Sequence, residues 1–135
     1  MLNPLTFIWA RTIAGEARGE SARGQLAVAF VPWNRARLSG RSVTQECLRS
    51  RQFSCWNSND SNRALILALT EHDLLPFLHH IMAVIDGISD PSHGATFYHA
   101  TSLHPSWSIG APSCAIIGLH RFYRNIPPYV ERPHA

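Results

Sequence analysis

Lysine is absent from this 135-residue chain, and all twelve basic residues are arginine. Nine acidic residues leave a formal net charge of +3, and the arginines are spread along the chain rather than clustered. Proteins that bind nucleic acid usually concentrate their positive charge on one face. The charge pattern therefore predicts no nucleic-acid partner and only a mild attraction to anionic polymers.

Cysteine is scarce, with Cys47, Cys55 and Cys114 forming an odd set in which no pair has a CxxC spacing. Such a set excludes a disulfide framework and a zinc ribbon, and it is typical of a chain made in a reducing cytosol. We expect all three residues to act as small hydrophobic side chains of the core.

Long apolar runs are also missing, since Arg11, Pro32 and His72 interrupt the most hydrophobic stretches. This excludes a membrane-spanning helix and predicts no insertion into a membrane. The apolar N-terminal segment has no basic leader before it, so we interpret it as a folded helix and not as a signal peptide.

Repeats, low-complexity segments and long linkers do not occur, which predicts a single domain over residues 1–135 with a loose tail at 126–135. The first two thirds of the chain have helical periodicity, and the last third is rich in Gly, Pro, Ser and His. The fold class expected is mainly α (α+β), with a small β or irregular segment in the last third. The first expected helix is Leu5–Ala14, ended by Gly15, and the second covers residues 22–37, capped by Ser21 and kinked or ended by Pro32. A short helix to about residue 49 follows with a Ser42–Gln45 capping box, and two more helices are expected at residues 61–72 and at residues 75–86, the latter closed by Gly87. Residues 95–100 are the expected strand, and residues 115–124 are expected to form a strand or a helix.

The densest cluster of acids and glycines is "GEARGE", in which Glu16 and Glu20 stand four residues apart between two apolar segments. If the first helix ends near Gly15, Glu16 lies at the negative end of its dipole and beside apolar neighbours. Both effects favour the protonated acid, which is the form that a general acid for glycosidic-bond cleavage needs. The alternative from composition alone is a solvated turn in which the two glutamates flank Arg18.

Four blocks of the sequence together resemble the spore-cortex-lytic (SleB-type) cell-wall hydrolase family, which also occurs in phage lysins. They are, in the order of the family, "TIAGEARGESARGQLAVAFVPWNR" at 12–35, "RQFSCWN" at 51–57, "GATFYHATSLHPSW" at 94–107 and "IIGLHRFYR" at 116–124. The chain departs from the family pattern at Pro32 and Trp33, where helix formers are usual, and at Phe97, where a histidine is common.

The resemblance implies a lysozyme-like fold and cleavage of peptidoglycan between N-acetylmuramic acid and N-acetylglucosamine. No metal or other cofactor is expected, because the sequence has no metal-ligand spacing. The resemblance also implies that Glu16 is the catalytic acid, with Glu20 in support either as a second carboxylate or as an acceptor for Arg18 or the neighbouring backbone. One working acid favours a lytic transglycosylase, which leaves 1,6-anhydro ends; a hydrolytic muramidase is the alternative. The residues expected to bind the sugar chain or to assist the acid are Gln52, Phe53, Ser54, Trp56, Thr96, Tyr98, His99, Trp107 and Tyr123.

Three other functions are compatible with parts of the sequence. A zinc peptidase or amidase could use His93, His99 and His104, but no HExxH motif is present. A cysteine amidase could pair Cys55 with His93 or His99, although a packed thiol is the simpler account of Cys55. A wall-binding module without catalysis would retain the aromatic residues and would not need Glu16.

The expected partner is therefore the peptidoglycan glycan strand, bound by a monomer. A single domain without a signal peptide or a wall-binding repeat is typical of a phage endolysin. Such an enzyme is made in the host cytoplasm and acts on the wall once the membrane has been permeabilised.

Overall fold

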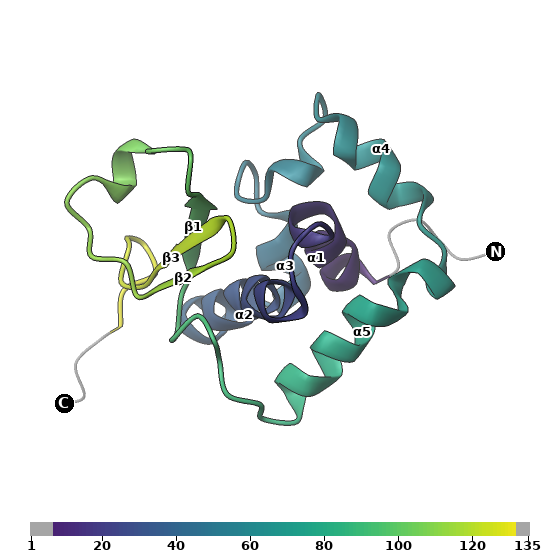
Figure 1. The fold of residues 1–135 in the computed structure, drawn as a ribbon, viewed down its shortest axis with the longest axis horizontal. Helices are drawn as coiled ribbons and strands as arrows, with labels where there is room; N and C mark the ends of the chain where they lie inside the picture. Colours follow the sequence, from purple (N-terminus) through teal and green to yellow (C-terminus); the bar gives the residue numbers. More distant parts are fainter. Residues whose placement is uncertain (1–6, 132–135) are drawn as a thin grey trace.

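The computed structural model describes residues 7–131. Five α-helices are followed by a small antiparallel sheet (Figure 1). The helices are α1 (Ile8–Ala17), α2 (Ala22–Ser39), α3 (Val43–Leu48), α4 (Ser61–Ala68) and α5 (Glu71–Ile85); short 3-10 turns occur at η1 (Ser54–Trp56) and η2 (Ser106–Ser108), and the strands are β1 (Phe97–Ala100), β2 (Ala115–Ile117) and β3 (His120–Tyr123). This mainly helical fold with a three-stranded sheet in its C-terminal part confirms the predicted fold class.

The central helix is α2, which lies between the other helices and the sheet (Figure 1). Its start is as predicted, because the side chain of Ser21 accepts a hydrogen bond from the Gly24 N–H. The helix continues through Pro32 to Ser39, so Pro32 does not end it. Gly40 then ends it in the left-handed conformation that glycine adopts without strain.

Helix α1 continues past the predicted end at Gly15 and includes Glu16 in its last turn. Gly15 packs against α4 and η1, where an added Cβ atom would lie 2.7 Å from the Cβ of Cys55 and 3.1 Å from a methyl group of Ile66. Glycine at this position therefore allows close packing of the helix instead of terminating it. The predicted start of this helix at Leu5 lies outside the described residues.

The boundary between α4 and α5 also differs from the prediction. Helix α4 ends at Ala68, and Thr70 caps α5 in a capping box with Asp73. The Ser42–Gln45 capping box, in contrast, is present as predicted. The segment 115–124, predicted as a strand or a helix, forms the hairpin of β2 and β3. Strand β3 lies in the middle of the sheet and pairs with both β1 and β2.

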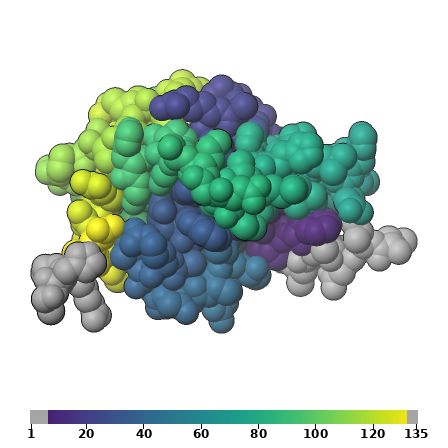
Figure 2. Space-filling view, turned by 90° about the horizontal axis from the view of Figure 1, so that it is seen from below, coloured from purple at the N-terminus to yellow at the C-terminus, as the bar shows by residue number. Residues whose placement is uncertain are grey.

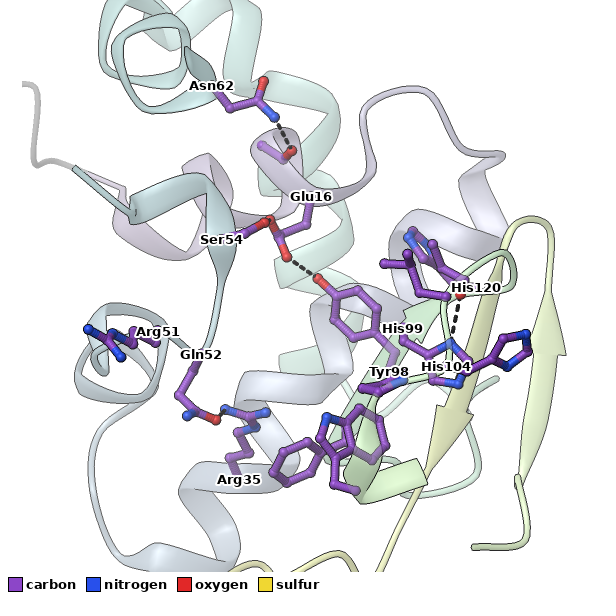
Figure 3. Close-up of a pocket in the computed structure, with 16 residues that line it drawn as sticks. Glu16, Arg35, Arg51, Gln52, Ser54, Asn62, Tyr98, His99, His104 and His120 are labelled. Atoms are coloured by element: carbon purple, nitrogen blue, oxygen red, sulfur yellow. Dashed lines mark hydrogen bonds between the residues drawn. The ribbon is translucent and has the colours of Figure 1, made fainter. Parts of the chain in front are cut away.

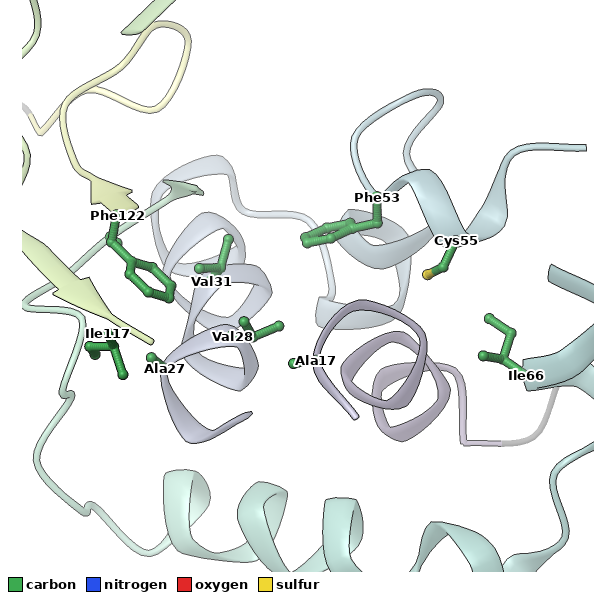
Figure 4. Packing of buried hydrophobic residues seen from close by; sticks show 10 residues of the cluster. Ala17, Ala27, Val28, Val31, Phe53, Cys55, Ile66, Ile117 and Phe122 are labelled. Carbon is green, nitrogen blue, oxygen red and sulfur yellow. The ribbon is translucent and has the colours of Figure 1, made fainter. Parts of the chain in front are cut away.

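Two buried clusters hold the elements together. One joins α1, α2 and α5 through residues such as Ile13, Phe30 and Leu74. The other joins α1 and α2 to η1, α4 and the sheet, with Val28, Phe53 and Phe122 fully buried (Figure 4). In the space-filling view, α5 lies across the face of the molecule between the first helix and the C-terminal part (Figure 2).

The segment that follows the sheet is not a loose tail within residues 126–131, which corrects the prediction. Tyr129 is 2% exposed, and its hydroxyl contacts Glu46, whose side chain is fully buried. The last predicted tail residues, 132–135, lie outside the described residues.

The three cysteines are free, and Cys47 and Cys55 are fully buried. Burial raises the pKa of Cys47 to about 12. Burial, together with the nearby Glu16, also raises the pKa of Cys55. A thiol with a raised pKa is a poor nucleophile, so the geometry favours the packing role predicted for Cys55 over a cysteine amidase.

Candidate active site

A pocket of about 890 Å³ opens between the helices and the sheet, and Glu16 lies at its edge (Figure 3). Among the described residues that line this pocket, Glu16 is the only carboxylic acid. The other lining residues come from α1, α2, the segment around η1, α4, β1 and the loop after it, and β3: Gly15, Arg35, Arg51, Gln52, Ser54, Asn62, Phe97, Tyr98, His99, Ala100, Leu103, His104, Pro105, Trp107 and His120.

Three donors converge on the carboxyl group of Glu16. The Cys55 N–H lies 3.2 Å from Oε2, the Ser54 hydroxyl lies 3.4 Å from the same atom, and the Tyr98 hydroxyl donates to Oε1. The buried position of Tyr98 and its closeness to Glu16 raise the pKa of its phenol, so it stays a donor at neutral pH. Glu16 is thus held in one orientation from both sides of the pocket (Figure 3).

One wall of the pocket is aromatic. Phe97 and Trp107 have their rings 5.1 Å apart, and the rings of His99, Trp107 and Tyr123 pack against one another with centres 5.2–5.7 Å apart. The Nε2 atom of His99 is 2.9 Å from the Tyr123 hydroxyl, so Tyr123 orients His99 from behind the pocket wall. Phe97 therefore contributes a ring face to this wall of the pocket.

The opposite wall carries arginine and amide groups. Arg35 is 2% exposed; it donates to the Thr96 carbonyl at 2.6 Å and to Gln52 Oε1 at 2.9 Å. Its guanidinium carbon lies 4.5 Å from the ring centre of Phe97, a cation–π contact that links the two walls. Arg51 and Asn62 are further polar groups at the rim of the pocket.

Five of the residues predicted to bind substrate line the pocket: Gln52, Ser54, Tyr98, His99 and Trp107. Four predicted residues do not line it. Phe53 is 1% exposed and belongs to the core, and Trp56 donates to the Thr12 hydroxyl and lines a separate pocket. Thr96 is fully buried, and Tyr123 lies behind the pocket wall, in contact with His99 and Trp107.

Glu20 lies outside the residues that line the pocket. Its Oε1 accepts a hydrogen bond from the Leu119 N–H at 3.0 Å, so its backbone partner is distant in sequence and not neighbouring. Arg18, the other predicted partner, instead donates to Asn62 at 2.6 Å. The structure therefore does not favour the alternative of a solvated turn in which the two glutamates flank Arg18.

Several lining residues were not predicted to bind the sugar chain, notably Arg35, Asn62, His104 and His120. His120 belongs to the block "IIGLHRFYR", and Arg35 is the last residue of the first block. Membership of these blocks is the signal that could have indicated both residues. Neither residue has a local pattern that would distinguish a pocket residue from a structural one.

Within residues 7–131, no group of three or more histidine, cysteine or acidic side chains is arranged to hold a metal ion. His93 is exposed on a loop and does not line the pocket with His99 and His104, so these three histidines form no ligand set. Nor does any helix in this part of the chain have the length and apolar character needed to cross a membrane.

Two partly buried histidines predict how stability depends on pH. Burial lowers the pKa of both His80 and His120 below the ordinary value of 6.5. The unfolded chain therefore binds more protons below that pH, and the stability present above it is lost as the pH falls. We expect the free energy of unfolding to decrease between about pH 7 and about pH 5.5, by at most about 1.4 kcal/mol per pH unit for each histidine. The melting temperature should fall over the same range.

His80→Gln should flatten this pH dependence, because its amide can still bind Gln25, which lies 2.9 Å from the imidazole in the native chain. Melting curves of the two proteins across this pH range measure the difference. A variant whose melting temperature falls as steeply as that of the native chain would assign the effect to other groups.

Comparison with known proteins places this geometry in a family. The chain matches the Cell Wall Hydrolase family over residues 19–123. It is similar to the solved catalytic domain of the Bacillus cereus SleB protein, with 26% identity, a TM-score of 0.66 and coverage of 87% of each chain.

It is also similar to the catalytic domain of the germination-specific lytic transglycosylase SleB from Bacillus anthracis. Here the identity is 26% and the TM-score 0.67, with coverage of 92% of this chain and 96% of the other. A comparison with curated proteins returns no match. The match to the family extends over most of the chain, and the fold agrees with that of two SleB catalytic domains: the chain belongs to the cell wall hydrolase family.

Proposed function

We propose that this protein cleaves the glycan strand of peptidoglycan between N-acetylmuramic acid and N-acetylglucosamine, as a lytic transglycosylase with Glu16 as its acid and base. The observation that carries the proposal is the carboxyl group of Glu16, the one carboxylic acid among the described residues of the pocket, which is held by Tyr98, Ser54 and Cys55. The similarity to a protein described as a lytic transglycosylase supports it.

In the first step, Glu16 donates its proton to the glycosidic oxygen, and the bond from C1 of muramic acid to that oxygen breaks. The carboxylate that forms is stabilised by the hydroxyl and N–H donors already directed at it. In the second step, this carboxylate takes the proton of the muramic C6 hydroxyl while O6 bonds to C1. The 1,6-anhydro ring closes without water, and Glu16 regains its proton.

The walls of the pocket fit a sugar chain. Aromatic faces such as those of Phe97 and Trp107 can pack against the apolar faces of pyranose rings. The N–H groups of Asn62 and Arg51 are donors suited to acetamido carbonyl and hydroxyl oxygens. The combination of one acid, an aromatic wall and a polar wall is what cleavage of a neutral glycan backbone requires.

A hydrolytic muramidase is the second candidate. Retaining and inverting glycosidases normally place a second carboxylate across the sugar, either close enough to attack or far enough to admit a water molecule. Glu20 is the nearest sequence neighbour that could act so, but it binds Leu119 outside the pocket lining. The geometry therefore favours the transglycosylase. Lysis of a host cell as a phage endolysin is the setting that we propose for it.

Muropeptide analysis tests the reaction. We expect mass spectrometry of digested sacculi to show 1,6-anhydro-muramic ends, with the same product distribution when EDTA is added, because among the described residues the pocket contains one carboxylic acid and no metal-ligand set. Reducible muramic ends throughout the digest would show that water is the nucleophile. Loss of activity in EDTA with recovery on addition of zinc would contradict the glycosidase assignment.

A further inference from the structure

Glu20 and His120 form a close pair at the junction of the α1–α2 turn and the β2–β3 hairpin. Glu20 Oε1 is 3.4 Å from His120 Nδ1 and 3.0 Å from the Leu119 nitrogen. Both side chains are largely buried, at 13% exposed for His120 and 14% for Glu20. In the space-filling view, the segment that joins the first two helices lies directly against the C-terminal hairpin (Figure 2).

Gly118 makes this approach possible. Its φ is +56°, a conformation that favours glycine, and an added Cβ atom would lie 2.7 Å from Glu20 Oε1. The hairpin thus brings its backbone onto the carboxylate, and the next two residues supply the N–H donor and the imidazole. A carboxylate used only as a surface charge would need no such fit.

His120 connects this pair to the pocket. The imidazole lines the pocket that contains Glu16, and its ring centre is 5.0 Å from that of Tyr98, whose hydroxyl donates to Glu16. Figure 3 shows His120 across the pocket from Ser54, with Glu16 and Tyr98 between them. Glu20, His120, Tyr98 and Glu16 therefore form a continuous row from the hairpin to the catalytic acid.

The two ring nitrogens of His120 have different environments. Nδ1 is buried and, among the described side chains, has no partner in hydrogen-bonding geometry; the oxygen of Glu20 is the charge that it faces. A carboxylate at Nδ1 favours the tautomer with its proton on that nitrogen. Nε2 then carries the free lone pair, and it is the nitrogen that can accept a hydrogen bond from a group in the pocket.

We propose that His120 is a substrate-contacting residue whose Nε2 accepts a hydrogen bond from a hydroxyl group of the sugar next to Glu16, and that Glu20 is its positioning residue. This inference rests on the proposed function. It gives the second glutamate of "GEARGE" a role that does not require it to reach the glycosidic bond. His120 Nε2 would also be a hydrogen-bond acceptor in a pocket whose other polar groups are mostly donors, such as Arg35, Arg51 and Asn62.

The charged and titratable groups around His120 predict a signature of this pair. Glu20 faces it from the α1–α2 turn, Glu16 from α1, and Tyr98 and His99 from β1. Burial lowers the pKa of His120, while Glu20 and Glu16 oppose this effect, and His99 adds to it. Removing the charge of Glu20 should therefore lower the pKa of His120 further.

The first experiment is an NMR titration of the His120 imidazole in the native chain, in Glu20→Gln and in Glu131→Gln. Glu131 is a matched control, because it is an exposed glutamate that pairs with Arg37 and does not line the pocket. We expect a lower pKa of His120 in Glu20→Gln and an unchanged value in Glu131→Gln. An unchanged value in both variants would overturn the pairing, whatever the enzyme's reaction.

The second experiment measures kcat/KM on soluble glycan strands for His120→Ala, His120→Gln, Glu20→Gln and the double variant Glu20→Gln with His120→Ala. We expect about a 10- to 100-fold loss for His120→Ala, the range for one lost hydrogen bond to substrate, and partial recovery with glutamine, whose amide oxygen can replace Nε2. Glu20→Gln should cost about 10-fold alone and nothing more when His120 is already alanine.

The outcomes separate the two proposals. Additive losses in the double variant, or full activity of a folded His120→Ala, would overturn the role of the pair while leaving Glu16 as the acid. A folded Glu16→Gln variant that still cleaves glycan would overturn the proposed function, even if the titration of His120 behaves as described. Thermal melts of each variant identify losses that arise from unfolding.

Discussion

Replacing Glu16 by glutamine should abolish nearly all cleavage of peptidoglycan, with a loss of about 10²- to 10⁴-fold in rate. The amide cannot deliver the proton that the leaving glycosidic oxygen needs, and it cannot take the proton of the C6 hydroxyl afterwards. Its oxygen can still accept from the Cys55 N–H, and its NH₂ group can donate to the Tyr98 hydroxyl. The variant should therefore fold and bind glycan strands normally.

The measurement is the rate of muropeptide release, compared with binding of the same protein to isolated sacculi. Glu131→Gln again serves as the matched control, since it makes the same chemical change on the surface. Tyr98→Phe should lose less activity than Glu16→Gln, because it removes one hydrogen bond to the acid and retains the acid itself. Full activity in a folded Glu16→Gln would show that another group is the acid, and the first to examine would be Glu20.

Features that depend on adjacent residues were predictable from the sequence. The Ser21 cap and the Ser42–Gln45 capping box follow from local hydrogen bonding, and the strand predicted at residues 95–100 is present at Phe97–Ala100. The Thr70–Asp73 capping box is of the same kind, and applying the same rule there would have placed the start of α5 correctly.

Features decided by packing between distant segments were not predictable. Gly15 would normally end a helix, but its contact with Cys55 and Ile66 makes it a packing position within α1. In the same way, Glu16 could be predicted as the acid from the motif around it, whereas Glu20 acquires its partners only when the hairpin at 118–120 folds against it. The sequence motif predicts the acid, and the tertiary structure shows what surrounds it.

The C-terminal segment is the clearest case, because one tyrosine in a proline-rich stretch connects it to the core. The ring of Tyr129 receives the guanidinium groups of Arg35 and Arg49, whose central carbons lie 4.9 and 5.4 Å from its centre. Its hydroxyl donates to Glu46, more than 80 residues earlier in the chain. No pattern in residues 126–131 reveals this partner.

Tyr129→Ala should therefore lower the free energy of unfolding by about 3–5 kcal/mol, the range for removing a buried aromatic side chain. Part of this loss comes from the cavity, and part comes from Glu46. Burial by itself would raise the pKa of this carboxyl group, but hydrogen bonds from Ser39, Tyr129 and Arg41 outweigh burial and lower it. Without Tyr129, a buried charge loses one of the donors that stabilise it. For a chain of this length, the melting temperature should fall by about 10–20 °C.

Urea denaturation of Tyr129→Ala, Tyr129→Phe and Val130→Ala separates these contributions. The phenylalanine variant retains the ring and loses the hydroxyl, so about 1–3 kcal/mol is expected. Val130 is the adjacent exposed residue, and its truncation should change stability by less than about 0.5 kcal/mol. A Tyr129→Ala variant as stable as Val130→Ala would mean that the segment does not pack in solution. If the segment packs as described, the loss should also reach the active site, because Tyr129 lies edge-on against Phe97, with the ring centres 5.8 Å apart, and Phe97 is part of the pocket wall.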